Sequence, residues 1–325
     1  MEVVPPASAV SAASPATSVR ASTKVPLRSS LLAISAGAVW SFGAVVTRSA
    51  AHADVWQYMI WRSVGIIFVI EIMTKVRRKP SRLPVAYTTG PKMFIATIGL
   101  LVASLGYIYA LKHTTTANAS FFASVTPLAT VIVARFVLGE RLSGVTIAAL
   151  GVALVGLLIM VAGDLGAGNM GGNAAALLSS AGFAVYAVCV RSDPKRDWSP
   201  VMPGYSLLLV VLCTGVCLVN GRTVLPPVGD VGFAVFHGGA LIVVGTLLFN
   251  RSAPNVPAVA MSVFAQFELV LAPFWVFLKF AEKPTFTTLI GGLFIVSAVV
   301  GKAVLDANEI ELPLTGSIRQ RSQNR

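Results

Sequence analysis

The sequence predicts an all-α integral membrane protein in which ten transmembrane helices form two inverted five-helix repeats. Three observations lead to this fold class. Of the 325 residues, 55% are hydrophobic and only 12% are charged, whereas soluble domains carry about 25% charged residues. Apolar runs of about 20 residues, long enough to cross a bilayer, recur along the chain. Two stretches that lie 142 residues apart also resemble each other.

Breaks rich in Pro, Gly and charge separate the apolar runs, as in KVRRKPSRLP after the second run and AGDLGAGNMGG after the fifth. In chain order, the ten predicted spans cover residues 30–48, 55–74, 92–111, 115–138, 144–162, 173–190, 201–219, 230–249, 256–278 and 285–305. These spans make two halves, 30–162 and 173–305. We expect the flanking tails, 1–29 and 306–325, to be disordered and cytoplasmic.

Lysine and arginine set the predicted direction of the helices. With the amino terminus inside, 18 of the 25 basic residues fall on the inner side of the membrane. The sequence therefore predicts that both termini are cytoplasmic. The net charge of +12 follows from this topology, because the basic residues cluster in short loops between apolar runs. We expect no binding of nucleic acid.

The internal repeat aligns SFFASVTP (120–127) with SVFAQFEL (262–269). The same offset of 142 residues places Glu140 on Glu282, and it also brings the spans of the two halves into register. Each half holds an odd number of spans, so the second half enters the membrane in the opposite sense. Inverted repeats of this kind build transporters with a substrate site near the midplane.

The chain resembles the drug/metabolite transporter superfamily, in its EamA-type ten-helix branch. The resemblance covers about residues 30–305. It depends on ALKHTTTANASFFASVTPLATVIVARFVLGERLSGVTIAALGVALVGLLIMV (110–161), on the similar stretch at 256–304 and on the arginine of YMIWRSVGIIFVI. It implies a transporter of small molecules and not an enzyme. One departure concerns the second repeat, where Leu269 occupies a position that is commonly proline. Because Pro273 follows one turn later, we expect the break in the ninth helix to be displaced.

The main candidate site residue is Glu268, at the centre of the ninth span. A carboxylate in mid-bilayer costs roughly 2.5–3.5 kcal/mol, so we interpret Glu268 as a substrate or proton site in a central cavity. The alternative is a protonated structural Glu that bonds to a neighbouring helix. The repeat offset maps Glu268 onto Thr126, which precedes Pro127, and it pairs Phe122 with Phe264. We expect these residues to face each other across the pseudo-twofold axis.

Gln266 lies about 200° round the helix from Glu268, so we expect it to contact a neighbouring helix on another face. Arg62 is interpreted as reaching lipid headgroups, with a counter-charge in the cavity as the alternative. His237, within the eighth span, is a candidate proton relay or a neutral histidine bonded to a carbonyl. By resemblance to the family, the remaining candidates for the cavity lining are Trp40, Tyr107, Asn118 and Tyr186, and their alternative role is packing.

We therefore expect a secondary transporter, with export favoured, for small organic metabolites such as amino acids. It would work by alternating access and be driven by a gradient, with proton coupling through Glu268 as a hypothesis. The chain contains no G-x-x-x-x-G-K-[ST] motif, and we expect no cofactor and no metal. The lone acid favours a zwitterionic or weakly cationic substrate.

The alternatives are an integral-membrane group-transfer enzyme and an organellar carrier of sugar phosphates or nucleotide sugars. We expect the plasma (inner) membrane as location. The oligomeric state is left open, a homodimer included.

Overall fold

The computed structural model describes residues 27–139, 144–164, 170–256, 258–283 and 285–307, so the predictions for the tails at 1–26 and 308–325 lie outside the described residues. The described chain is helical, with no strand. Its elements are α1 (Leu27–Ser49), α2 (Val55–Val76), α3 (Val85–Thr88), α4 (Pro91–His113), α5 (Thr116–Ala123), α6 (Thr126–Leu138), α7 (Gly144–Asp164), α8 (Met170–Ser192), α9 (Val201–Val219), α10 (Val228–Phe236), the π-helix η1 (His237–Ile242), α11 (Val243–Ser252), α12 (Ala258–Ala265), α13 (Phe267–Phe280) and α14 (Phe286–Ala307).

Among the described residues, six helical segments are long and apolar enough to cross a membrane. They are α1, α4, α8, α9, the continuous run Val228–Ser252 and the segment Val263–Phe280. α6 and stretches of α7 and α14 are apolar but shorter. Large apolar side chains such as Phe136, Val219 and Phe286 are exposed on the outside of the bundle. Apolar side chains of this kind are compatible with surrounding lipid. The helical backbone is compatible with lipid as well, because a helix satisfies its backbone hydrogen bonds internally.

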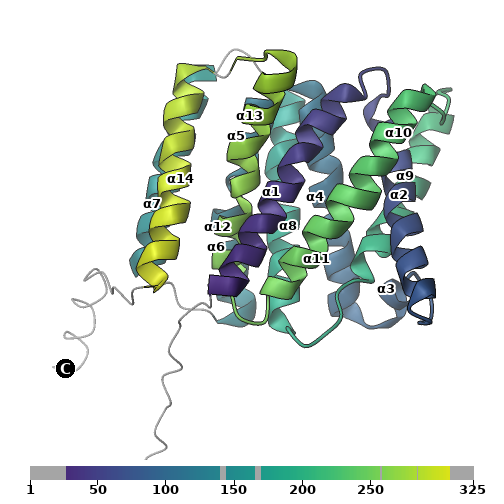
Figure 1. Cartoon of the computed structure of the whole chain (residues 1–325), viewed down its shortest axis with the longest axis horizontal. Coiled ribbons are helices and arrows are strands. Elements are labelled where there is room, and N and C mark those ends of the chain that lie inside the picture. The colour runs from purple at the N-terminus through teal and green to yellow at the C-terminus, as the bar shows by residue number, and fades with distance from the viewer. Residues whose placement is uncertain (1–26, 140–143, 165–169, 257, 284, 308–325) are drawn as a thin grey trace, which may run out of the picture.

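The helices form one bundle in which the two predicted halves are packed together. α4 lies against α8, α2 against α9, and α1 against both α11 and α13. α7 and α14 form a pair at one edge of the bundle (Figure 1). The α4–α8 contact is close because it is made by glycines: a Cβ on Gly182 would lie 2.5 Å from the carbonyl oxygen of Gly99. Small residues of this kind let membrane helices pack backbone to backbone.

Two helix breaks lie at positions that correspond to each other in the internal repeat. The first separates α5 from α6 at residues 124–125, and the second separates α12 from α13 at Gln266. Pro127 removes the backbone donor for the carbonyl of Ala123. That carbonyl instead accepts hydrogen bonds from the hydroxyls of Thr126 (2.7 Å) and Ser180 (3.1 Å). The break is therefore stabilised by side chains from its own helix and from α8.

The prediction that the second break is displaced toward Pro273 is wrong. α13 runs through Pro273 without interruption, and the break lies at Gln266. There the backbone makes tight three-residue bonds, from the amide of Gln266 to the carbonyl of Val263 and from the amide of Leu269 to that of Gln266. Proline is tolerated seven residues into α13 because neighbouring groups in a membrane bundle can satisfy the carbonyl that it frees.

A π-helical turn interrupts the apolar run Val228–Ser252 at η1. It coincides with a close approach between η1 and α2, since a Cβ on Gly238 would lie 1.9 Å from the carbonyl oxygen of Arg62. Only glycine fits at that position. π-turns frequently occur at functional sites, and this one begins at His237.

Candidate functional site

A cavity of about 120 Å³ lies in the middle of the bundle. Helices of both predicted halves supply its walls. The lining residues are Trp40, Gly43, Arg62, Leu100, Ala103, Ser104, Tyr107, Ile108, Ala123, Thr126, Ser179, Phe183, Tyr205, His237, Ile242, Thr246, Ala265, Gln266, Glu268 and Leu269. The wall is therefore largely apolar with a few polar groups, which is the usual character of a small-molecule site.

Arg62 brings a positive charge into this cavity. Its side chain is only 4% exposed, and its Nη1 atom donates a hydrogen bond of 2.6 Å to the hydroxyl of Ser104 on α4. The expectation that Arg62 reaches lipid headgroups is wrong, and the alternative of a cavity counter-charge fits the geometry. The reason is local packing, since α2 lies against α9 and η1 and turns this face inward.

Glu268 and Gln266 line the cavity together. The expectation that these two residues cannot share one face is wrong. That reasoning assumed a continuous helix, but the helix stops at Gln266 and α13 starts at Phe267. Glu268 consequently lies in the first turn of α13, where the partial positive charge of a helix N-terminus favours anions. A close neighbour is Gly37 of α1, whose Cβ would lie 3.2 Å from the backbone nitrogen of Glu268.

Several buried polar atoms of the cavity residues have no hydrogen-bond partner among the described residues. They are Nε1 of Trp40, Nε of Arg62, the hydroxyl of Tyr107 and Oε1 of Gln266. Burying such a group without a partner costs about 1–3 kcal/mol. The cavity therefore offers two donors, one acceptor and one hydroxyl that can do either, all of which a polar ligand or water would satisfy.

His237 belongs to a small network that starts at the cavity wall. The side chain is 3% exposed, and its Nδ1 atom lies 2.8 Å from the hydroxyl of Tyr58. The hydroxyl of Thr47 donates to the same Tyr58 oxygen at 3.2 Å. His237 thus bonds hydroxyl groups and not the carbonyl considered as the simpler alternative. Thr47 also lies 3.5 Å from His237 Nδ1, so His237, Tyr58 and Thr47 form one buried hydrogen-bonded group.

The structure divides the predicted site residues into two groups. Five line the cavity, namely Glu268, Thr126, Trp40, Tyr107 and His237. Phe264 is buried in the hydrophobic core, and Phe122 packs against that core from a partly buried position. Tyr186 is fully buried, while the side chain of Asn118 lies outside the described residues. The hydroxyl of Thr126 is already bonded to Ala123, which leaves its methyl group for contact with a ligand.

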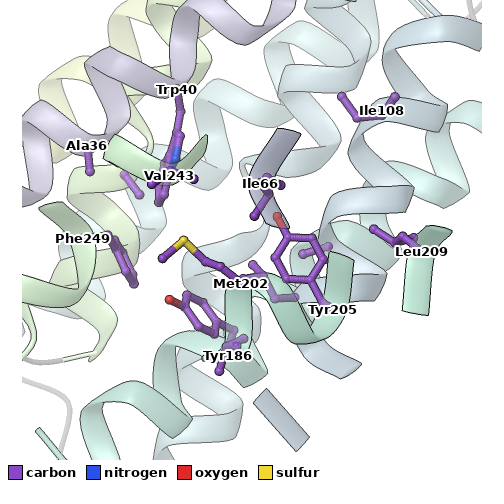
Figure 2. Close-up of a cluster of buried hydrophobic side chains, with 14 of the residues drawn as sticks. Ala36, Trp40, Ile66, Ile108, Tyr186, Met202, Tyr205, Leu209, Val243 and Phe249 are labelled. Atoms are coloured by element: carbon purple, nitrogen blue, oxygen red, sulfur yellow. The ribbon is translucent and has the colours of Figure 1, made fainter. Parts of the chain in front are cut away.

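Four rings form what we call the aromatic cluster, consisting of Trp40, Phe183, Tyr186 and Phe249. Phe249 lies at the centre, with ring centroids 5.6 Å from Trp40, 5.3 Å from Phe183 and 6.0 Å from Tyr186. Figure 2 shows Trp40, Phe249 and Tyr186 in succession across the core. Trp40 and Phe183 line the cavity, so the cluster forms part of its wall.

Sequence reasoning did not assign Ser104, Tyr205 and Thr246 to the cavity, although all three line it. A hydroxyl inside an apolar span is a weak signal, because such groups also bond to the carbonyl of the preceding turn. Within the described residues, no group of three or more His, Cys, Asp or Glu could hold a metal ion. The polar chemistry of the cavity therefore comes from single side chains.

Apolar helices around a central cavity with a few polar groups are typical of an integral membrane protein of the transporter class. The chain belongs to the EamA-like transporter family, whose model matches residues 27–162 and residues 170–302. It is 23% identical over 272 residues to the pseudopaline exporter CntI of Pseudomonas aeruginosa, in strain PAO1 and in strain UCBPP-PA14. Each alignment covers 83% of this chain and 94% of the relative.

The fold is also found in a solved crystal structure that is 21% identical to this chain. The two superpose with a TM-score of 0.67, over 85% of this chain and 98% of the other. Family membership and the apolar helices together indicate a membrane-embedded transporter of small molecules rather than an enzyme.

Proposed function

We propose that this protein is a secondary exporter of small zwitterionic metabolites, such as amino acids. One observation carries the proposal: Arg62 and Glu268 line the same central cavity. An amino acid presents a carboxylate and an ammonium group, which these two side chains complement. Among the described residues no ion pair within 4.0 Å joins Arg62 to Glu268. The two side chains can therefore bind opposite ends of one ligand.

We further propose that ten membrane spans form two inverted five-helix halves that rock about this cavity. The family model matches twice along the chain, which supports a duplication. The packing supports it as well. α2 lies on α9 and α7 on α14, each helix against its repeat counterpart, and the pair α4–α8 has its counterpart in α11–α1. Such symmetry-related packing is expected when two inverted repeats enclose a midplane site.

Glu268 is the group we propose for proton coupling, with His237 as a second carrier. A carboxyl group in a mostly apolar cavity favours its neutral form, and a charged ligand or water entering the cavity changes that balance. The ammonium group of the substrate and the proton then compete for one carboxylate, so binding of the substrate is accompanied by release of the proton. The buried hydroxyls of Tyr58 and Thr47 hydrogen-bond with His237 and would stabilise its ring when it exchanges a proton with the cavity.

We propose that the protein lies in the plasma (inner) membrane with both termini in the cytoplasm. The basic residues at the α2–α4 and α8–α9 connections support this direction. On that orientation the aromatic cluster separates the cavity from the cytoplasm, and export requires it to open.

Reconstitution in liposomes tests the proposed function. Vesicles loaded with one unlabelled amino acid at a time are placed in a trace of the same radiolabelled compound, and counterflow is recorded. We expect transient accumulation for one or a few zwitterionic compounds and none in protein-free vesicles. Failure of every zwitterion combined with counterflow of a sugar phosphate would contradict the proposal.

A further inference from the structure

A second cavity, of about 270 Å³, opens at the end of the bundle where α2, α11 and the α8–α9 connection meet. We call it the basic cleft. Its lining residues are Ile70, Met73, Thr74, Arg77, Lys79, Arg82, Arg196, Asp197, Trp198, Ser199, Leu247, Asn250 and Arg251. Five of these are cationic and one is a carboxylate, so the cleft carries a strong excess of positive charge.

Two of the five cations are already paired. Arg82 makes an ion pair of 2.9 Å with Asp197, and Arg196 pairs with Asp193 at the same distance. Burial raises the pKa of Asp197, but hydrogen bonds from Ser199 and the cations Arg82 and Lys79 outweigh it and hold that pKa below its ordinary value. The carboxylate therefore stays ionised, and it neutralises one guanidinium only.

The other three cations form no ion pair within 4.0 Å among the described residues. Arg77, Lys79 and Arg251 come from the end of α2 and from α11, and all three are exposed. Topology alone accounts for basic residues at a cytoplasmic surface. It does not account for their convergence on one concave site that reaches a buried polar group.

That buried group is Asn250, on the wall of the cleft. Its Oδ1 atom accepts a hydrogen bond of 2.5 Å from the hydroxyl of Tyr186, while its buried Nδ2 atom has no partner in the described part of the chain. An amide donor without a partner, on a wall that also carries three cations outside any ion pair, favours an acceptor-rich ligand. Carboxylate and phosphate groups are ligands of this kind.

The cleft is also directly next to the central cavity. On α11, Thr246 lines the cavity, whereas Leu247, Asn250 and Arg251 line the cleft. The aromatic cluster lies between them, because Tyr186 stacks on Phe249 and bonds to Asn250. A ligand bound at Asn250 would therefore contact the residue that accepts the hydrogen bond from Tyr186.

We propose that the basic cleft is an anion-binding vestibule that receives solutes through a carboxylate group and delivers them past the Tyr186–Asn250 pair into the central cavity. This inference rests on the proposed transport function and adds a second binding site for the carboxylate of the substrate. The phosphate of a lipid headgroup is an anion that the same cations would bind, so the test separates lipid from solute.

The test measures binding of succinate and of inorganic phosphate by titration calorimetry. The full-length protein is held in nanodiscs of neutral phosphatidylcholine, where no gradient or transport exists. The cleft variant is Arg77→Gln with Arg251→Gln. The matched control is Lys75→Gln with Lys195→Gln, which removes two exposed cations from the same end of the molecule but outside the cleft lining.

We expect saturable binding of at least one probe to wild type and control, and binding about tenfold weaker in the cleft variant, since each exposed cation contributes up to about 1 kcal/mol. Affinity should also fall with added salt. Equal affinities in the cleft variant and the control would overturn the inference.

Nanodiscs that contain phosphatidylglycerol form the lipid arm. If wild type in neutral lipid binds neither probe, and phosphatidylglycerol raises the melting temperature of the control but not of the cleft variant, the cleft is a lipid site and the inference is overturned. Counterflow in liposomes decides the transport function separately. A protein that transports but shows no cleft-dependent binding refutes the vestibule alone.

Discussion

The Nη1 atom of Arg62 donates a hydrogen bond of 2.6 Å to the hydroxyl of Ser104, and this bond joins α2 to α4 at the wall of the central cavity. It fixes one edge of the guanidinium, while the Nε atom has no partner among the described residues. The bond therefore orients a buried charge toward the space that a substrate carboxylate would occupy.

Replacing Ser104 with Ala should weaken substrate binding. The guanidinium loses the acceptor that orients it, and hydrogen bonds to charged groups contribute about 1.5–3 kcal/mol. We expect KM for the amino acid identified by counterflow to rise about tenfold, with a smaller change in kcat. Ser63→Ala is the matched control. Ser63 is buried, follows Arg62 in the sequence and lies outside the cavity lining, and its hydroxyl has no partner in the described chain. If both variants have the same KM, Ser104 does not position Arg62.

Replacing Glu268 with Gln should separate exchange from proton-driven transport. The amide keeps the size of the side chain but neither binds nor releases a proton. We expect counterflow to persist, with a raised KM, while accumulation driven by a pH gradient is lost. Glu282→Gln is the control: that carboxylate bonds the Thr116 amide, lies 3.7 Å from Arg48 and does not line the cavity. Gradient-driven accumulation that survives in Glu268→Gln would exclude Glu268 as the coupling site.

Replacing Tyr186 with Phe should loosen the barrier between cavity and basic cleft. The ring contact with Phe249 is kept and only the bond to Asn250 is removed. In a background lacking Cys189, Cys213 and Cys217, a cysteine at Thr246 reports access from the cleft. We expect a charged thiol reagent on the cleft side to react several-fold faster, since one hydrogen bond contributes about 1 kcal/mol.

The control for this change is Tyr87→Phe, which removes a hydroxyl bond of 2.7 Å to the carbonyl of Gly204 away from both cavities. Reaction rates that rise equally in the two variants would show a general loosening of the bundle. The Tyr186–Asn250 pair would then have no special part in closing the cavity.

Replacing Gly238 with Ala should destabilise the bundle. The new Cβ would lie 1.9 Å from the carbonyl oxygen of Arg62, so η1 and α2 must separate. Overpacking of this kind costs about 1–3 kcal/mol, which lowers the melting temperature by about 5 °C in a chain of this size. Gly232→Ala in α10 meets no atom within 4 Å and should be neutral or slightly stabilising. The melting temperatures of the Gly238→Ala and Gly232→Ala variants are compared by heating each in detergent and measuring the remaining folded protein by size-exclusion chromatography.

Part of the candidate site follows from the sequence. Glu268 could be identified because a carboxylate in an apolar run is costly unless it lines a wet space, and the repeat offset then led to Thr126. The break near Pro127 could be predicted because proline removes a backbone donor. By contrast, Gln266 and Arg62 were misplaced. The regular helical rotation used for Gln266 does not hold across a break that has no proline to mark it, and the direction of Arg62 depends on which helices cover α2.

The sequence by itself determined that this is an apolar, membrane-embedded helical protein with an internal echo and a buried acid. Those properties follow from hydropathy and local chemistry, which depend only on residues that are close together in the sequence. Only the tertiary structure decided which side chains share the cavity, that Arg62 turns inward on Ser104, and that Tyr186 bonds Asn250 between the cavity and a basic cleft. These relationships join residues of different helices, and the close approaches that produce them depend on glycines whose role appears only once a neighbouring backbone is in place.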